Sequence, residues 1–300
     1  MRRIALLGAP SSIGLRPDDQ TGQPQDVSRA PAVLREVGLV ERLEATDFGD
    51  VMPPAYVDYV RPPGGARNEA GLAAYTRSLG GRIVECLEDQ RFTLVLGGDC
   101  SIVLPCLYGA GTWSGPIGLA YVDAHADFAT PPESMTGSVA SMGLALAIGR
   151  GDSPLASFDG RVGLVDADKV ALIGRRDQGQ SYGHDALMTS GVLDLPYREV
   201  TSRGFADTAS TVLERVASNR TTGFWILVDA DVLDPTAMPA VGSPEPDGPT
   251  FEDLTALLQP LVHHPKAIGM AVTLYDPSLD PDRTCAMALS GFLETLLRDR

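Results

Sequence analysis

The chain has 300 residues, with 24 Lys and Arg against 39 Asp and Glu, which gives a formal net charge of −15. This charge argues against nucleic acid or an anionic membrane as the main partner, because both attract an excess of basic residues. The 4 cysteines are too scattered for a disulfide scaffold, and no apolar run approaches the roughly 18 residues of a membrane span, so we expect a cytoplasmic protein.

Short apolar runs alternate with longer helical patterns along the chain. In chain order, the predicted strands are Ile4–Gly8, Phe92–Gly97, Ile117–Val122, Lys169–Gly174, Trp225–Asp229 and Ile268–Leu274. The predicted helices are Ala30–Leu43, Leu72–Leu87, Ser138–Ile148, Phe205–Val216, Phe251–Leu261 and Cys285–Leu297. Strands that are apolar throughout are typical of a parallel sheet covered on both faces. The alternation therefore predicts a doubly wound α/β sheet in a single domain over residues 1–300.

Three of the predicted strands end in short polar motifs. Residues 97–101 read Gly-Gly-Asp-Cys-Ser, residues 123–127 read Asp-Ala-His-Ala-Asp, and residues 229–235 read Asp-Ala-Asp-Val-Leu-Asp-Pro. Ligands of open α/β sheets bind beyond the carboxyl ends of the strands. The three motifs are therefore expected to meet at one edge of the sheet.

The side chains of these motifs form a candidate metal site. Alternate residues of an extended chain share a face, so Asp123, His125 and Asp127 are expected to point into one cleft. The same spacing joins Asp229 and Asp231. Four carboxylates close together repel one another unless a cation compensates their charge. A single Asp, His or Cys at a strand end would more often have a structural role. The motifs taken together favour two divalent ions bridged by carboxylates. The candidate ligands are Cys100, Asp123, His125, Asp127, Asp229 and Asp231.

The three motifs, in this order and approximate spacing, resemble the metal-binding motifs of the ureohydrolase family, which includes arginases, agmatinases and formiminoglutamases. The sequence Gly-Ala-Pro at residues 8–10 is also similar, and the resemblance extends over essentially the whole chain. It implies a three-layer α/β/α sandwich around a central eight-stranded parallel sheet. It also implies two Mn²⁺ ions, hydrolysis of a guanidino or amidino carbon–nitrogen bond, and a homo-oligomer, either a trimer or a hexamer.

The resemblance distributes the motif residues over two cation positions. It implies that the first cation is bound by Cys100, Asp123, Asp127 and Asp229. It implies that the second is bound by His125, Asp123, Asp229 and Asp231. Asp123 and Asp229 would then bridge the two cations. Asp127, which would hydrogen-bond the nucleophile, and His125 are the candidate catalytic residues.

Cys100 departs from the family pattern, because most relatives carry a histidine at this position. A thiolate is a softer ligand than an imidazole and favours Zn²⁺ or Fe²⁺ over Mn²⁺. A similar cysteine occurs in the hydroxyarginine-hydrolysing branch of the family. The substitution is therefore compatible with activity and predicts a different metal preference at the first position.

The loop after the second motif lacks two side chains that arginases use. An asparagine of the arginase loop corresponds to Ala129, and the histidine that acts there as a proton shuttle corresponds to Ala140. A shuttle contributes about 10²–10⁴-fold to the rate, so His184 or bulk water would have to replace it. Small hydroxyls remain in the loop as candidate substrate-binding groups, at Ser134, Thr136 and Ser138.

The glutamate that pairs with the guanidinium in relatives is also missing. Its Met-Glu-Val context matches Ala271, and counting back from Pro277 gives Leu274, which is equally uncharged. A buried guanidinium without a carboxylate loses a charge-assisted contact and retains its desolvation cost. Another acid could take over, and the candidates are Glu133, Glu245 and Asp276.

Asp177 ends a segment, residues 173–177, that resembles the Ile-Gly-x-Arg-Asp segment of the family. There the aspartate lies near the substrate. The alternative is a salt bridge with the neighbouring Arg175 or Arg176. Asp177 and Glu245 therefore complete the candidate substrate-binding residues.

Three functions fit these observations. The leading hypothesis is a binuclear-metal hydrolase acting on a small guanidino or amidino substrate. A second is a related hydrolase of a formimino or amide bond, which accommodates the missing glutamate better. A third is a binding protein that has lost hydrolysis, which the alanines at 129, 140 and 271 favour and the intact metal motifs oppose.

Overall fold

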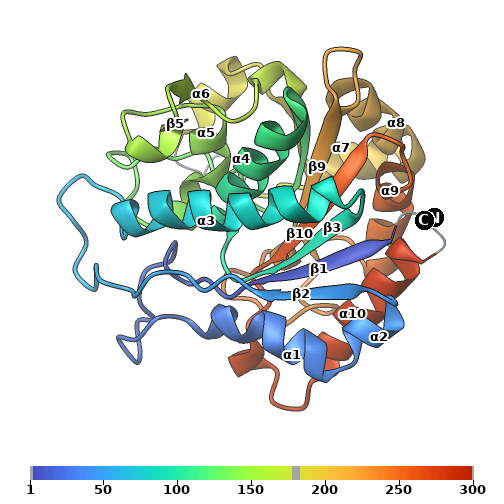
Figure 1. Ribbon diagram of the computed structural model, residues 1–300, viewed down its shortest axis with the longest axis horizontal. Coiled ribbons are helices and arrows are strands. Elements are labelled where there is room, and N and C mark those ends of the chain that lie inside the picture. The colour runs from blue at the N-terminus through green and yellow to red at the C-terminus, as the bar shows by residue number, and fades with distance from the viewer. Residues whose placement is uncertain (1–2, 178–182, 299–300) are drawn as a thin grey trace.

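The computed structural model describes residues 3–177 and 183–298. Its central sheet has eight parallel strands in the order β2-β1-β3-β10-β9-β4-β7-β8 (Figure 1). These strands are β1 (Ile4–Ala9), β2 (Thr46–Asp50), β3 (Phe92–Gly97), β4 (Ile117–Val122), β7 (Val170–Ile173), β8 (Leu193–Leu195), β9 (Gly223–Asp229) and β10 (Ala267–Thr273). A separate antiparallel pair consists of β5 (Ser157–Phe158) and β6 (Arg161–Val162).

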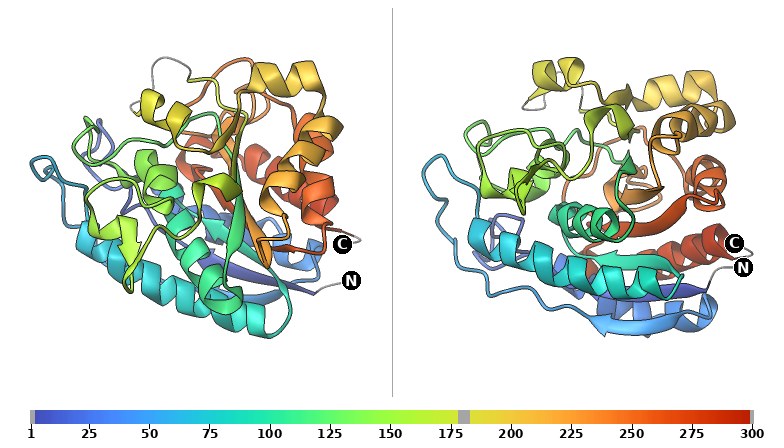
Figure 2. Two further views of the ribbon diagram at one scale, coloured as in Figure 1. Left: turned by 90° about the horizontal axis from the view of Figure 1, so that it is seen from above. Right: turned by 45° about the horizontal axis from the view of Figure 1, so that its top comes forward.

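Helices cover both faces of the sheet. The α-helices are α1 (Ala30–Glu36), α2 (Leu39–Arg42), α3 (Glu69–Glu88), α4 (Val103–Ser114), α5 (Gly143–Ala147), α6 (His184–Thr189), α7 (Tyr197–Arg203), α8 (Phe205–Val216), α9 (Phe251–Val262) and α10 (Thr284–Leu297). The 3₁₀ helices are η1 (Asp26–Arg29), η2 (Cys100–Ile102), η3 (Val139–Met142), η4 (Pro154–Ala156), η5 (Ala167–Lys169), η6 (Ala230–Val232) and η7 (Pro277–Leu279). Helices α3, α4 and α5 pack on one face, and α1, α8, α9 and α10 pack on the other (Figures 1 and 2). No described helix combines the length and apolar composition that crossing a bilayer requires.

Each central strand sends alternate side chains into two separate cores. In β3, Leu94 packs with α1 and α10, whereas Val95 packs with α3 and α4. Met270 and Ala271 of β10 divide in the same way. Both faces of the strands are buried, which is why the strands are apolar at every position. The predicted three-layer sandwich with an eight-stranded parallel sheet is confirmed.

The apolar pattern identifies the six inner strands but not the two at the edges of the sheet. Strand β2 is mostly exposed and β8 has only 3 residues, so neither needs an apolar run. The helix predicted over residues 30–43 is divided into α1 and α2 by Gly38, whose φ of 84° is left-handed. Helix α4 has no predicted counterpart, because Pro105 and Gly109 interrupt its helical pattern.

The carboxyl ends of β3, β10, β9 and β4 lie side by side and form the edge where the polar motifs meet. Asp99 ties the loops after β1 and β3 together. Its buried carboxylate accepts hydrogen bonds from Ser11 Oγ at 3.0 Å, Gly14 N at 3.1 Å and Ser101 N at 2.9 Å. These loops approach so closely that a Cβ at Gly98 would lie 1.7 Å from the Ser11 carbonyl oxygen, so only glycine fits there. This packing fixes the backbone that carries Cys100.

Candidate functional site

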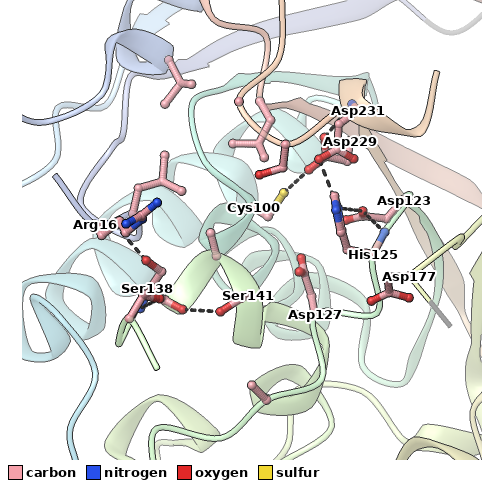
Figure 3. Close-up of a pocket in the computed structure, with 18 of the residues that line it drawn as sticks. Arg16, Cys100, Asp123, His125, Asp127, Ser138, Ser141, Asp177, Asp229 and Asp231 are labelled. Carbon is pink, nitrogen blue, oxygen red and sulfur yellow. Dashed lines mark hydrogen bonds and ion pairs between the residues drawn. The ribbon is translucent and has the colours of Figure 1, made fainter. Parts of the chain in front are cut away.

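A cavity of about 430 Å³ opens at this edge of the sheet (Figure 3). All six candidate ligands line it: Cys100, Asp123, His125, Asp127, Asp229 and Asp231. They come from the segments after β3 and β4, from the last residue of β9 and from the segment that follows it, as the positions of the motifs predict. The rest of the described wall mixes polar side chains, such as Arg16 and Gln25, with apolar ones, such as Val27 and Phe128.

The candidate ligands form two groups that share one carboxylate. Ligand atoms of Cys100, Asp123 and Asp127 all lie within 4.8 Å of one another, and so do those of Asp123, His125 and Asp231. Asp229 connects the groups, since its Oδ2 accepts a hydrogen bond from the Cys100 thiol and its Oδ1 accepts one from Asp231 N at 2.9 Å. The two groups could each hold a cation, with Asp123 as a candidate ligand of both.

The second motif converges for a reason other than the predicted one. Strand β4 ends at Val122, so Asp123 to Asp127 are not extended and do not share a face by alternation. Instead, His125 N donates to Asp123 Oδ1 at 2.7 Å, and Asp127 takes a left-handed conformation with φ 47°. The tight loop returns the Asp127 side chain to the cavity. The expectation of a shared strand face was wrong, but the expectation of one cleft was right.

Burial makes negative charge expensive in this cluster. It raises the pKa of Asp123 to about 6, with the charge of Asp231 adding to the effect. It likewise raises the pKa of Asp229 and of Asp231 to about 7, with the neighbouring Asp123 and Asp229 charges contributing. The pKa of the Cys100 thiol is raised well above its ordinary value by burial and by Asp229. Such a cluster is stabilised by bound cations, which favour the ionised forms.

His125 stands between two of the candidate carboxylate ligands. Burial alone would lower its pKa, but Asp123 and Asp231 outweigh that effect and raise it far above its ordinary value. The Nδ1 atom of His125 lies 3.4 Å from Asp123 Oδ1 and 3.2 Å from Asp231 Oδ2. This nitrogen faces the same point as the carboxylates, as a metal-ligating imidazole does.

Several ligand oxygens are buried without a hydrogen bond. Among the described residues, Asp123 Oδ2 and Asp231 Oδ1 have no hydrogen-bond partner, and Asp231 Oδ2 has only its ion pair with His125. Buried carboxylate oxygens are ordinarily hydrogen-bonded or bound to a metal. The donor set of carboxylates, imidazole and thiol therefore fits divalent cations.

The predicted substrate-binding hydroxyls separate into two groups. Thr136 and Ser138 line the cavity, together with Ser141 and Ser243, which the sequence did not single out. Ser134 does not line it, because its Oγ accepts a hydrogen bond from Gly137 N at 3.0 Å within its own turn. The prediction for Ser134 as a group facing the cavity was therefore wrong.

Asp177 has both of the roles considered for it, as a residue that faces the cavity and as the partner of a neighbouring arginine. It lines the cavity, and its Oδ1 lies 3.4 Å from the Arg175 guanidinium. Its Oδ2 accepts a hydrogen bond from Ala126 N at 3.1 Å, inside the second motif. Asp177 therefore supports the loop that carries His125 in addition to facing the cavity.

Of the two positions matched to the missing glutamate, Leu274 lines the cavity and Ala271 does not. Ala271 is fully buried in β10, opposite Val95 of β3 and Leu227 of β9, and faces the core shared with α3 and α4. Leu274, directly after β10, is half-buried and lines the cavity. A side chain at Ala271 therefore cannot contact a substrate in the cavity, whereas one at Leu274 can.

Of the three acids proposed to replace it, Glu245 reaches the cavity. Its Oε1 lies 3.8 Å from His125 Nε2. Glu133 is held outside by Arg150, whose charge lowers the Glu133 pKa to about 2, and Asp276 caps η7 through Ser278. His184 begins α6 and is not part of the described cavity wall, so it is not placed to replace the shuttle histidine.

Three side chains around the ligands were not identified from the sequence. Tyr121 donates a hydrogen bond to Asp127 Oδ2 at 2.6 Å, and Thr273 Oγ1 lies 3.2 Å from Cys100 Sγ. Arg176 donates to the carbonyl oxygens of Val232 at 2.8 Å and Glu245 at 2.9 Å. Tyr121 and Thr273 lie within apolar strand runs, where a sequence pattern reads them as core. Arg176 stands in the family-like segment but was weighed only as a partner of Asp177.

Comparison with known proteins gives the same family for the whole chain. A sequence model described as the arginase family matches residues 2–297. The arginase of Bacillus caldovelox is 28% identical in sequence over 305 residues, which cover 98% of each chain. The native structure of Bacillus caldovelox arginase at pH 5.6 matches with a TM-score of 0.88 and 25% identity, covering 100% of this chain and 99% of the other. Human arginase-1 is 27% identical over 287 residues, covering 93% of this chain and 86% of its own length. The resemblance stated from the motifs is confirmed, and the chain belongs to the arginase family.

Proposed function

We propose that the protein is a binuclear-metal hydrolase that cleaves a carbon–nitrogen bond of a small guanidino or amidino compound, releasing an amine and urea or a urea-like product. The observation that carries the proposal is the pair of ligand groups sharing Asp123 in one cavity. Membership of the arginase family supports metal-dependent hydrolysis of this bond type. Assembly into a homo-oligomer, as a trimer or hexamer, stays a prediction.

The proposed ligand sets follow the two groups. Cys100, Asp123, Asp127 and Asp229 would hold the first cation, and His125, Asp123, Asp229 and Asp231 would hold the second; Asp229 is added to the two groups because it contacts both. Oxygen and imidazole donors suit Mn²⁺, whereas the sulfur of Cys100 moves the preference of the first position toward Zn²⁺ or Fe²⁺. A bound pair of divalent cations supplies Lewis-acid polarisation and a water of lowered pKa.

The side chains of the protein orient the reactants in this proposal. Asp127, whose carboxylate is held by Tyr121, accepts a hydrogen bond from the attacking water. His125 keeps its Nδ1 toward Asp123 and Asp231 and turns its Nε2 to Glu245. The hydroxyls of Thr136 and Ser138, and Asp177 in another part of the cavity wall, bind the polar remainder of the substrate.

A second candidate function is hydrolysis of a formimino or amide bond. Leu274 favours it, because this apolar side chain occupies the cavity wall where relatives are expected to pair a guanidinium with glutamate. A guanidinium taken out of water beside leucine loses hydration without a compensating carboxylate. A neutral group at the same place has no such cost.

Metal analysis coupled to a screen of guanidino, formimino and amide compounds tests the proposal. We expect two equivalents of divalent metal per chain and release of urea or a urea-like product from a guanidino or amidino compound. Turnover confined to formimino or amide compounds would favour the second candidate. Full activity in the metal-free protein would contradict the metal centre. If metal-loaded protein hydrolyses none of the compounds, the remaining hypothesis is a binding protein that has lost hydrolysis.

Glu245 is expected to attract the cationic end of a substrate. In Glu245→Gln, KM for a guanidino compound should rise about fivefold with little change in kcat, because a carboxylate that is 36% exposed contributes up to about 1 kcal/mol to such a contact. Steady-state kinetics measure the effect. Glu133→Gln is the matched control, since Glu133 is bound by Arg150 outside the cavity. Equal KM values in both variants would exclude Glu245 from substrate binding.

A further inference from the structure

Tyr121 contacts one of the proposed ligands from within the sheet. It lies on β4, two residues before Asp123, and is fully buried. Its hydroxyl donates a hydrogen bond of 2.6 Å to Asp127 Oδ2. This bond joins a rigid strand to a carboxylate that stands in a loop.

The bond leaves one oxygen of Asp127 for a cation. A carboxylate has two oxygens, and the phenol fixes the rotation of the group by engaging one of them. A ligand atom of Asp127 then lies within 4.8 Å of those of Cys100 and Asp123. Without the phenol, the carboxylate could rotate away from a point that its neighbours already make negative.

The backbone of Asp127 is anchored separately from its side chain. Its carbonyl oxygen accepts a hydrogen bond from Ala145 N of α5 at 3.2 Å, and its φ of 47° is left-handed. A left-handed aspartate persists where the surroundings hold it. Helix α5 therefore fixes the loop, and Tyr121 fixes the direction of the carboxylate.

The fold leaves room for the phenol at the start of α5. A Cβ at Gly143 would lie 3.2 Å from the Tyr121 hydroxyl oxygen and 3.4 Å from the Cys100 carbonyl oxygen. Any side chain at this position would press on the hydroxyl. The glycine and the tyrosine thus form a matched pair beside the sulfur-containing group of ligands.

We propose that Tyr121 is a positioning residue, which holds Asp127 in the ligand set of the cation that Cys100 binds. The inference rests on the metal centre of the proposed function. Outer partners of metal ligands commonly change metal affinity by about 10- to 100-fold, and Tyr121 occupies such a place. A tyrosine that only filled the core would affect stability and leave metal affinity unchanged.

Titration of the metal-free protein with Co²⁺ tests this role without any measurement of activity. Coordination of Co²⁺ by a thiolate gives a charge-transfer absorption in the near ultraviolet, which reports the cation at Cys100 alone. In Tyr121→Phe, the Co²⁺ concentration at half-maximal absorption should rise about 10- to 100-fold. Cys100→Ala should abolish the band and so assign it.

Tyr275→Phe is the matched control. Tyr275 is also buried and donates a 2.7 Å hydrogen bond to an aspartate, Asp280, which is not part of the described cavity wall. Both variants should lower the melting temperature of the metal-free protein, since each loses one hydrogen bond to a carboxylate. Only Tyr121→Phe should move the Co²⁺ midpoint.

Gly143→Ala gives a second test that keeps the tyrosine. Gly143 has right-handed helical angles, so alanine fits its backbone, but the added Cβ crowds the phenol. We expect a smaller rise in the Co²⁺ midpoint than in Tyr121→Phe. If Tyr121→Phe does not fold, an unchanged midpoint in Gly143→Ala overturns the inference.

The outcomes separate this inference from the proposed function. An unchanged midpoint in folded Tyr121→Phe overturns the role of Tyr121 while leaving the metal centre in place. Absence of the thiolate band in the wild-type protein contradicts the assignment of Cys100 as a ligand, and the inference is overturned with it. A raised midpoint in Tyr121→Phe, with Tyr275→Phe unchanged, supports both.

Discussion

Replacing Asp123 with Asn is expected to remove both cations and to lower turnover by more than about 100-fold. Loss of an outer partner of a metal ligand already costs about 10- to 100-fold, and Asp123 belongs to both ligand groups. Asn keeps the shape of the side chain and its Oδ1, which accepts the backbone bond from His125. The variant therefore removes the charge that the cations need and leaves the loop in place.

Thermal unfolding separates this effect from a general loss of stability. A cation that binds the folded state alone raises the melting temperature with its concentration. Wild-type protein should gain melting temperature when Mn²⁺ or Zn²⁺ is added and lose it with a chelator. Asp123→Asn should show no such response, and metal analysis should find less than one equivalent per chain.

Asp280→Asn is the control for this prediction. Asp280 is buried, accepts hydrogen bonds from Tyr275, Cys285 and Ala286, and is not part of the described cavity wall. Its variant should unfold at a lower temperature with and without metal, and should keep the response to metal. A metal response that survives in Asp123→Asn would contradict the shared role of Asp123.

The candidate metal ligands could be predicted from the sequence because they lie at the ends of buried strands. A continuous apolar run identifies β4 and β9, and the polar residues that follow must then reach the carboxyl edge of the sheet. The strand order then brings the three motifs together, since β3, β10, β9 and β4 are neighbours in the sheet. Edge strands such as β2 are partly exposed and short, so no apolar run marks them.

The walls of the cavity were harder to predict, because they depend on contacts between distant segments. Ser134 bonds within its own turn, whereas Thr136, two residues later, lines the cavity. The role of Tyr121 needs the position of Asp127, which a left-handed loop and not strand alternation determines. Neither turn closure nor loop handedness is visible in a pattern of residue types.

The two candidate positions of the missing glutamate are only three residues apart, yet one lies in the cavity wall and the other in the hydrophobic core. Matching Met-Glu-Val selects Ala271, and counting from Pro277 selects Leu274, three residues later. In a strand that distance changes the face, and here it also leaves the strand, because β10 ends at Thr273. The end of the strand thus decides which of the two positions faces the cavity.

This difference predicts opposite outcomes for the same substitution at the two positions. Leu274→Glu should fold. Its kcat/KM for a guanidino compound should be about 10- to 100-fold above that of the natural protein, because a charge-assisted contact contributes about 1.5–3 kcal/mol. Leu274 lines the cavity and already has a left-handed φ of 59°, so glutamate adds no backbone strain. Formimino and amide compounds should gain nothing.

Ala271→Glu should fail to fold. Its side chain would enter the buried core that β10 shares with α3 and α4, where a carboxylate without a cationic partner costs several kcal/mol. Circular dichroism and thermal unfolding distinguish the two variants, and kinetics on guanidino compounds follow for the one that folds. A folded, metal-loaded Leu274→Glu without any gain on guanidino compounds would mean that the cavity does not hold the guanidinium against residue 274. The reacting group would then have to be bound from the side of Glu245, or be uncharged.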